Sequence, residues 1–185
     1  MKYIAPIFLI CSFGLFAVSL WFPAFCTERA TGLGGGHEPY MGIGAFLLLF
    51  GCFGVITGGV GVTWLANPLL LFAWVISMAA WITAMTSRSP RASAALMVLV
   101  LLSLAFSALA VIFSASFQLF TEIIVNEAGG MNRICHRLPG YWLWLASTIV
   151  MLVGNGIQMI VLYVTQKIQQ ESIIPFDQMT KTLKL

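Results

Sequence analysis

The sequence predicts an all-α integral membrane helix bundle, and three observations lead to this class. Sixty per cent of the 185 residues are apolar and only 8% are charged, against about 25% charged residues in an ordinary soluble domain. The mean hydropathy is +0.97, more than a soluble domain of this size can bury. Apolar segments of about 20 residues, enough to cross a bilayer, recur along the chain. A water-soluble enzyme, a nucleic-acid-binding protein and a disordered chain are therefore excluded.

Five apolar segments are predicted to be helices, so that we expect four to five transmembrane helices joined by small soluble loops. They are about Tyr3–Phe25, Met41–Val62, Leu65–Met85, Ala92–Phe120 and Tyr141–Val164. Residues 1–164 are expected to form the bundle and residues 165–185 a cytoplasmic tail. The tail is expected to continue the fifth helix and to break at Ile174-Pro175, because proline disfavours a helical residue before it.

The stretch 42–85 determines the number of spans. It holds 44 residues without a single charge, and as one helix it would be about 66 Å long, twice the thickness to be crossed. We expect a break near 58–68, where Gly58, Gly59 and Gly61 precede Asn67-Pro68. Two spans joined by a tight turn is the simpler interpretation. One span plus a re-entrant half-helix is the alternative.

The distribution of lysine and arginine predicts the orientation. Two schemes place six of the nine basic residues in the cytoplasm, as the positive-inside rule requires. One has five spans and an outer N-terminus, and the other has four spans and an inner N-terminus. Both place the Thr86–Arg91 link and the C-terminal tail in the cytoplasm and Thr121–Gly140 outside.

Aromatic residues lie at or near the ends of the apolar segments, where membrane proteins carry interfacial belts. They are Trp21, Trp64, Tyr141, Trp142 and Trp144. We interpret them as interfacial anchors rather than as ligand-binding aromatics.

Two runs carry a family resemblance. The segments Trp64-Leu65-Ala66-Asn67-Pro68-Leu69-Leu70-Leu71 and Gly140-Tyr141-Trp142-Leu143-Trp144-Leu145-Ala146-Ser147 resemble segments of small, uncharacterised bacterial polytopic membrane proteins. The resemblance extends loosely over the second to fifth segments. It implies a multi-pass protein of the bacterial inner membrane, and it implies no activity, cofactor or site residue.

Polar groups inside the apolar segments are few and uncharged, which disfavours a proton- or ion-coupled transporter. The strongest is Asn155 between two glycines, with Gln158 on the same helix face. One interpretation is that these amides bind a neighbouring helix, and the other is that they line a path for a solute. We favour the first.

Small residues form a stripe along the fourth segment. Ser103, Ser107, Ala110 and Ser114 recur at spacings of four, three and four, which places them on one helix face and permits close approach of another helix. Ser147, Gly154 and Gln158 form a comparable stripe on the fifth segment, and Gly54 and Gly58 match a GxxxG pattern. These faces are expected to pack within the chain or against a partner.

Two cysteines lie in polar loops. Cys26 and Cys135 are interpreted as free structural thiols, as a disulfide formed in an oxidising periplasm, or, with His37 and His136, as a metal-binding set. No CxxC spacing supports the metal. The glycines at 34–36 do not belong to a phosphate-binding loop. We therefore assign no catalytic residue, no metal and no cofactor.

The function expected from these features is non-catalytic. A small inner-membrane accessory or interaction protein, such as a subunit, an assembly factor or a toxin-immunity protein, would act through helix packing and its outer loop. Its partners would be the lipid bilayer and either another protein or further copies of itself, with no nucleic acid. An oligomeric channel or carrier for a small solute is the alternative, and a periplasm-facing thiol or metal enzyme is a further one.

Overall fold

The computed structural model describes residues 4–30, 37–86, 90–124 and 131–182. Its helices are α1 (Ile4–Ser19), α2 (Gly44–Thr57), α3 (Ala66–Thr86), α4 (Pro90–Ser116) and α5 (Pro139–Thr182), with two 3₁₀ segments, η1 (Gly59–Leu65) and η2 (Phe117–Leu119). Its strands are β1 (Pro23–Ala30), β2 (His37–Ile43), β3 (Glu122–Ile124) and β4 (Met131–Arg137). The chain is therefore mostly helical, as predicted, with strands where loops were expected.

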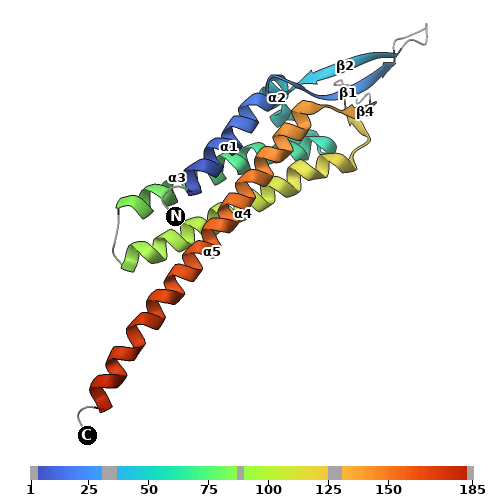
Figure 1. Ribbon diagram of the computed structural model, residues 1–185. Coiled ribbons are helices and arrows are strands. Elements are labelled where there is room, and N and C mark those ends of the chain that lie inside the picture. The colour runs from blue at the N-terminus through green and yellow to red at the C-terminus, as the bar shows by residue number, and fades with distance from the viewer. Residues whose placement is uncertain (1–3, 31–36, 87–89, 125–130, 183–185) are drawn as a thin grey trace.

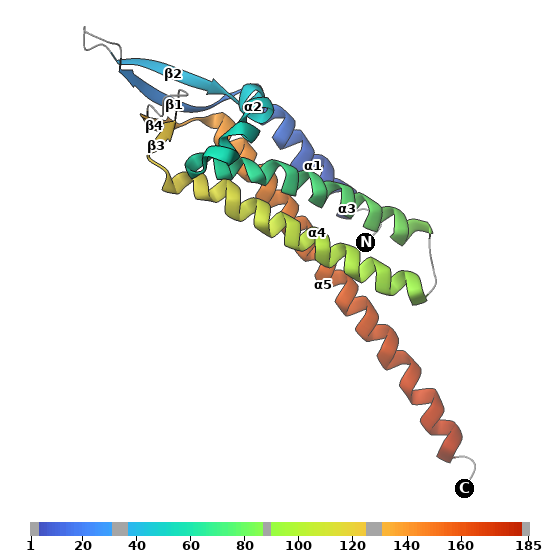
Figure 2. The ribbon, with the colours of Figure 1, turned by 180° about the vertical axis from the view of Figure 1, so that it is seen from behind.

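Four helices, α1, α3, α4 and α5, pack side by side, and the strands lie at one end of this bundle (Figures 1 and 2). The other end holds the start of α1, the end of α3 and the start of α4, and α5 projects beyond it. The strand-bearing end is called the sheet end from here on. The link between α3 and α4 and the C-terminal part of α5 therefore lie at the opposite end of the molecule.

The strands form one antiparallel sheet in the order β2-β1-β4-β3. Strand β1 pairs with its sequence neighbour β2 and also with β4, where Thr27 is opposite Ile134. This sheet corrects the expectation of an all-α chain with plain loops. The two hairpins, β1–β2 and β3–β4, join into one sheet only through the pairing of β1 with β4, whose residues lie more than 100 positions apart, so that local sequence patterns gave no indication of it.

The first helix is shorter than predicted. It ends at Ser19, and the chain enters β1 at Pro23, whereas the apolar pattern continues to Phe25. Phe25 is apolar because it is buried under the sheet against Phe117, with ring centroids 5.7 Å apart, and not because it lies in the membrane helix.

The predicted break in 42–85 is confirmed, and it is narrower than the expected range. Helix α2 ends at Thr57, and Gly58 and Gly59 adopt φ values of 75° and 59°, a left-handed conformation that glycine tolerates and other residues rarely adopt. The 3₁₀ segment η1 then leads directly into α3. Asn67-Pro68 does not interrupt the helix, because Pro68 falls in the first turn of α3, where a missing N–H costs nothing.

Helix α2 does not form a second full span. It has 14 residues, about 21 Å at 1.5 Å per residue, and it stays with η1 at the sheet end (Figures 1 and 2). The stretch 42–85 thus contains one helical segment of spanning length and one shorter helix, and the re-entrant half-helix stays a prediction. Gly59–Thr86, Ser93–Leu119 and Pro139–Gln169 are long and apolar enough to cross a membrane, and α1 is shorter. The expected count of four to five spans is not confirmed.

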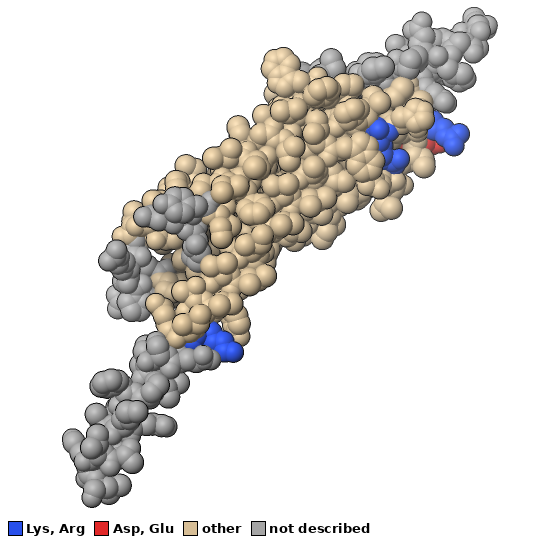
Figure 3. All heavy atoms as spheres, in the orientation of Figure 1, with Lys and Arg blue, Asp and Glu red and all other residues tan. Residues whose placement is uncertain are grey.

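The surface of the bundle is apolar along its length. In the view of Figure 3, lysine, arginine and acidic side chains appear only towards the two ends of the described surface. The uncharged part of α5, residues 139–166, is about 42 Å long, close to the roughly 40–45 Å of a bilayer with its headgroup layers. These dimensions suit a bundle that stands in a membrane with the sheet at one surface.

The tail prediction needs one correction. Helix α5 runs from Pro139 to Thr182 and passes through Ile174-Pro175 without ending there. A proline removes one backbone hydrogen bond and disfavours a helix, but the turns on both sides supply enough helix-forming residues to continue it.

Candidate functional site

The polar residues predicted on α4 and α5 lie against each other in the middle of the bundle. Asn155 is only 1% exposed. Its Nδ2 lies 2.8 Å from Ser103 Oγ, 3.2 Å from the Ser103 carbonyl oxygen and 3.3 Å from Ser107 Oγ. The amide therefore donates to the serine stripe of the neighbouring helix, within a buried contact.

The whole stripe on α4 is buried, and its serines connect three helices. Ser103 accepts from Asn155 on α5 and donates to the Ala73 carbonyl on α3 at 2.8 Å. About three turns further along α4, Ser114 Oγ lies 3.1 Å from Thr148 Oγ1 of α5. Ala110 sits between them and is fully buried. Because hydrocarbon offers no other partners, the polar side chains of the packed helices bond to one another or to backbone carbonyls.

Glycine and serine bring α1 close to α5. A Cβ at Gly154 would lie 2.6 Å from Cγ of Phe8 on α1, so only glycine leaves room for that ring. Ser12 of α1 donates to the Ser147 carbonyl at 2.8 Å and accepts from Trp74 Nε1 at 2.9 Å. The stripe predicted on the fifth segment is thus an intramolecular packing face.

Gln158 lies apart from the Asn155 contact. It is buried and lines a small hollow of about 10 Å³ together with Trp81 and Leu96. This volume is about the minimum that a single water molecule needs. Within the described residues, Asn155 and Gln158 do not share a polar channel.

The glycine pair predicted as GxxxG has a different role. Gly54 on α2 packs directly against Gly61 on η1, so a side chain at Gly61 would collide with the Gly54 backbone. Trp64 of η1 packs in the same way over Gly51 and donates from Nε1 to the Leu48 carbonyl at 3.0 Å. The glycines hold α2 and η1 together as a compact hairpin at the sheet end.

A cavity of about 330 Å³ lies beneath the sheet. Its walls come from α1, α2, η1, the first turn of α3, η2, strands β1 and β3, and the start of α5. The residues around it are Phe16, Ser19, Leu20, Ala24, Phe25, Gly44, Leu47, Leu48, Gly51, Gly54, Gly58, Val60, Gly61, Thr63, Trp64, Asn67, Phe117, Ile123, Gly140, Tyr141 and Trp144. None of them carries a charge, and the volume lies at the lower end of the range for small-molecule sites.

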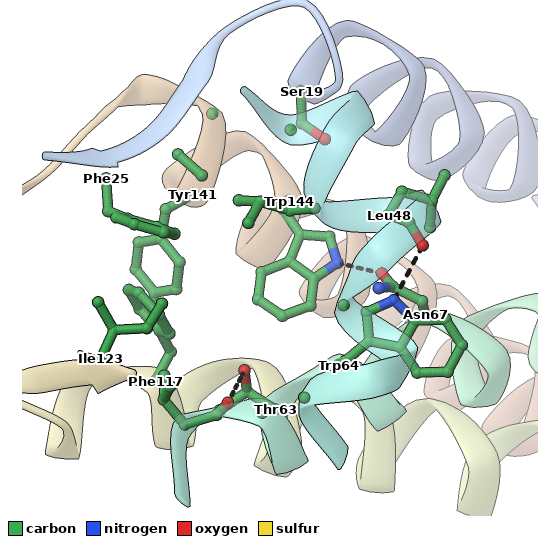
Figure 4. A pocket seen from close by; sticks show the side chains of 18 of the residues that line it. Ser19, Phe25, Leu48, Thr63, Trp64, Asn67, Phe117, Ile123, Tyr141 and Trp144 are labelled. Carbon is green, nitrogen blue, oxygen red and sulfur yellow. Dashed lines mark hydrogen bonds between the residues drawn. The ribbon is translucent and has the colours of Figure 1, made fainter. Parts of the chain in front are cut away.

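Aromatic side chains dominate the view into this cavity, which we call the subsheet cavity (Figure 4). Trp144 donates from Nε1 to Asn67 Oδ1 at 2.9 Å, and Tyr141 donates to the Ser114 carbonyl at 3.3 Å. The interpretation of Trp64, Tyr141 and Trp144 as interfacial anchors is therefore wrong, since all three line the cavity. For Trp21, which is 87% exposed, and for the exposed Trp142, the interfacial interpretation stays a prediction.

Arg137 fastens the sheet to the bundle. Its guanidinium donates to the carbonyl oxygens of Phe117, Gln118 and Phe120, at 3.4, 2.7 and 3.2 Å, where the α4–η2 helical segment ends. Helix ends leave such carbonyls without intrahelical partners. A backbone hydrogen bond of 2.9 Å from Leu138 N to the Ala24 oxygen adds a second link.

Cys26 and Cys135 are brought to adjacent strands. Cys26 on β1 is opposite His136 on β4, and the register shifts between Cys26 and Thr27, so that Cys135 falls at the irregularity. Both cysteines are in the thiol form, and the disulfide stays a prediction. Among the described residues no three histidine, cysteine or acidic side chains gather as a metal site. The side chain of His37 and the glycines 34–36 lie outside the described residues.

The cavity was missed because its signal is spread over the chain. Trp64-Leu65-Ala66-Asn67 and Tyr141-Trp142-Leu143-Trp144 are ordinary sequences for helix ends in a membrane. Asn67 is the residue that could have indicated a cavity. It is polar, and the break expected near 58–68 gave its side chain no role. Comparison with protein-family models, with curated proteins and with solved structures found no match to this chain.

Proposed function

We propose that this chain is a small, non-catalytic accessory or interaction protein of the bacterial inner membrane, and that its partner contacts the sheet end. The hydrogen bonding of Asn155 carries this proposal. Its amide is the strongest polar group inside the bundle, and it is bound to Ser103 and Ser107 in a buried helix contact. A channel would need that group to face water.

The sheet supports the location of the partner site. It combines two segments that are distant in sequence into one unit, and Arg137 and the Leu138–Ala24 bond fasten it to the helices. Polar and charged side chains with access to solvent, such as Glu122, Arg133 and His136, belong to this end. Surface chemistry that distinguishes one partner from another is therefore available there, while the bundle offers lipid an apolar face.

The orientation that we propose places the sheet outside and the tail in the cytoplasm. If α3, α4 and α5 cross the membrane, the α3–α4 link and the tail lie on one side of it and the sheet lies on the other. This holds whether or not α1 is a further span. We further propose that α1 crosses as well, since it runs along α5 and is bonded to it through Ser12. Six lysines and arginines are then inside and three outside, as the positive-inside rule requires.

Photo-crosslinking in living cells at native expression tests the partner site. A photoreactive phenylalanine analogue replaces Arg133 or His136, both exposed on β4, and in a control chain it replaces Ile160, which is exposed in the middle of α5. The proposal predicts one discrete protein adduct from the β4 positions and lipid adducts alone from Ile160.

Two outcomes would contradict the proposal. Absence of any protein adduct from both β4 positions would remove the partner from the sheet end. A crosslink at Ile160 to a second copy of the chain, without one at β4, would favour assembly through the helices and thus the oligomeric channel.

A further inference from the structure

The subsheet cavity has the features of a binding site for an uncharged amphiphile. Its wall contains aliphatic and aromatic side chains and the backbone of several glycines, and no ionisable group of the acidic or basic kind. A charged head group would lose its hydration there without gaining a counter-ion, which is costly. An apolar ligand with a neutral head avoids that cost.

Three polar groups at the wall define what the head must offer. Ser19 Oγ donates to the Phe16 carbonyl at 2.6 Å and Thr63 Oγ1 to the Val60 carbonyl at 2.8 Å, so each hydroxyl can only accept from a ligand. Asn67 uses its Oδ1 to accept from Trp144. Its Nδ2 has no hydrogen-bond partner in the part of the chain that the structure describes.

The amide end of Asn67 points into the cavity beside Trp144 (Figure 4). A ligand carbonyl or hydroxyl at that point would accept from Nδ2, and a ligand hydroxyl could also donate to Thr63. The hydrogen bond from the Trp144 indole to Oδ1 fixes the orientation of the Asn67 amide. Nδ2 therefore faces the cavity before a ligand binds. This pre-organisation reduces the entropic cost of binding.

The position of the cavity indicates where the ligand comes from. It lies at the sheet end, where exposed Trp21 and Trp142 mark the level of a membrane interface. Helix α2 forms one wall and exposes Leu49, Phe53 and Ile56, so the same short helix contacts the cavity on one side and the surrounding medium on the other. A lipid of the adjacent leaflet is therefore the nearest source of an apolar chain.

We propose that the subsheet cavity binds a single-chain, uncharged lipid whose ester carbonyl or hydroxyl accepts a hydrogen bond from Asn67. This site is independent of the partner proposed for the sheet. The probe is a 1-monoacylglycerol with a diazirine in its chain, added to the purified full-length protein in nanodiscs. Adducts are located by mass spectrometry of peptides after illumination.

The wild-type chain supplies the first test. The adduct should map to cavity-lining peptides of β1, α2 and η1, and an excess of unlabelled monoacylglycerol should reduce it at least fivefold. An alkyl phosphate of equal chain length should not compete, because the cavity has no cation to receive it. Adducts spread over the lipid-facing helices without competition, or equal competition by the alkyl phosphate, would overturn the proposal.

Substitutions on one helix supply the second test. Leu47→Trp fills the cavity, whereas Leu49→Trp adds the same bulk at a position that is 69% exposed on α2. Labelling should fall at least fivefold in the first variant and stay within twofold of wild type in the second. Asn67→Leu should weaken competition about three- to tenfold, the effect of one neutral hydrogen bond. Equal labelling of Leu47→Trp and wild type would contradict a ligand inside the cavity.

Discussion

The hydrogen bond between Asn155 and Ser103 can be measured separately from its surroundings. We predict that Asn155→Leu and Ser103→Ala are energetically coupled, because Nδ2 of the asparagine lies 2.8 Å from Oγ of the serine. Hydrogen bonds between membrane helices contribute about 0.6 kcal/mol on average and up to about 1.7 kcal/mol. This is the shortest of the three contacts that Nδ2 makes, so a coupling of about 0.6–1.7 kcal/mol is expected.

The single substitution Asn155→Leu should cost only about 1 kcal/mol of unfolding free energy. The amide loses its contacts with Ser103 and Ser107, but Oδ1 has no partner in the folded state, so its removal relieves the desolvation of a buried acceptor. Leucine also has the same branched heavy-atom skeleton as asparagine. Function that depends on a partner at the sheet should persist in this variant, whereas function as a solute path should be lost.

A double-mutant cycle in bicelles, with unfolding free energies measured by steric trapping, gives the coupling. The bond from Ser103 to the Ala73 carbonyl is lost in both variants that carry Ser103→Ala, so its loss cancels in the coupling energy. Ser114→Ala is the matched control, because Ser114 belongs to the same stripe but contacts Thr148 instead of Asn155. Its coupling to Asn155→Leu should stay within about 0.5 kcal/mol of zero. Equal couplings for Ser103 and Ser114 would refute this explanation of the contact.

Two further predictions concern the joints of the fold. Gly154→Ala should destabilise the chain by about 1–3 kcal/mol, because the added Cβ would meet the Phe8 ring. Gly156→Ala, whose Cβ would meet nothing within 4 Å, should be neutral or slightly stabilising. The reverse order of the two unfolding free energies in bicelles would contradict the α1–α5 packing. Arg137→Lys should cost about 1–2 kcal/mol, because Nη2 alone makes all three carbonyl contacts and the lysine side chain, which is one bond shorter, places its ammonium short of that position. Arg133→Lys on the same strand should be neutral, and equal loss in both variants would show that Arg137 does not clamp the sheet.

The helical part of the fold could be predicted because it depends on composition and local pattern. The bounds of α3 and α4 and the start of α5 were placed to within a few residues, and the break was expected where Gly58 turns the chain. The contact of Asn155 with a neighbouring helix was also anticipated, since an amide in a lipid-crossing helix needs a partner. In each case the physical requirement is visible within one or two helices.

The sheet and the cavity could not be predicted in this way. Strands β1 and β4 stabilise each other only after the helices have brought their ends together, and neither has the alternating pattern of an independent strand. Phe25 was therefore counted with the first helix. Trp64 and Trp144 resembled interfacial anchors because their spacing in the sequence does not show which way their side chains point. That direction depends on the positions of α2 and η1.

In the proposed arrangement, the sheet and the α3–α4 link lie on opposite sides of the membrane, and thiol accessibility measures this directly. The measurement uses two chains in which Cys11, Cys26 and Cys52 are replaced by alanine, one retaining Cys135 and the other carrying Thr86→Cys with Cys135 also replaced. An impermeant thiol reagent is applied to intact spheroplasts and then to opened membranes. We predict that Cys135, on β4, reacts in intact spheroplasts and that the cysteine at position 86, at the end of α3, reacts only after opening. Reaction of both before opening, or of position 86 alone, would contradict the proposed arrangement.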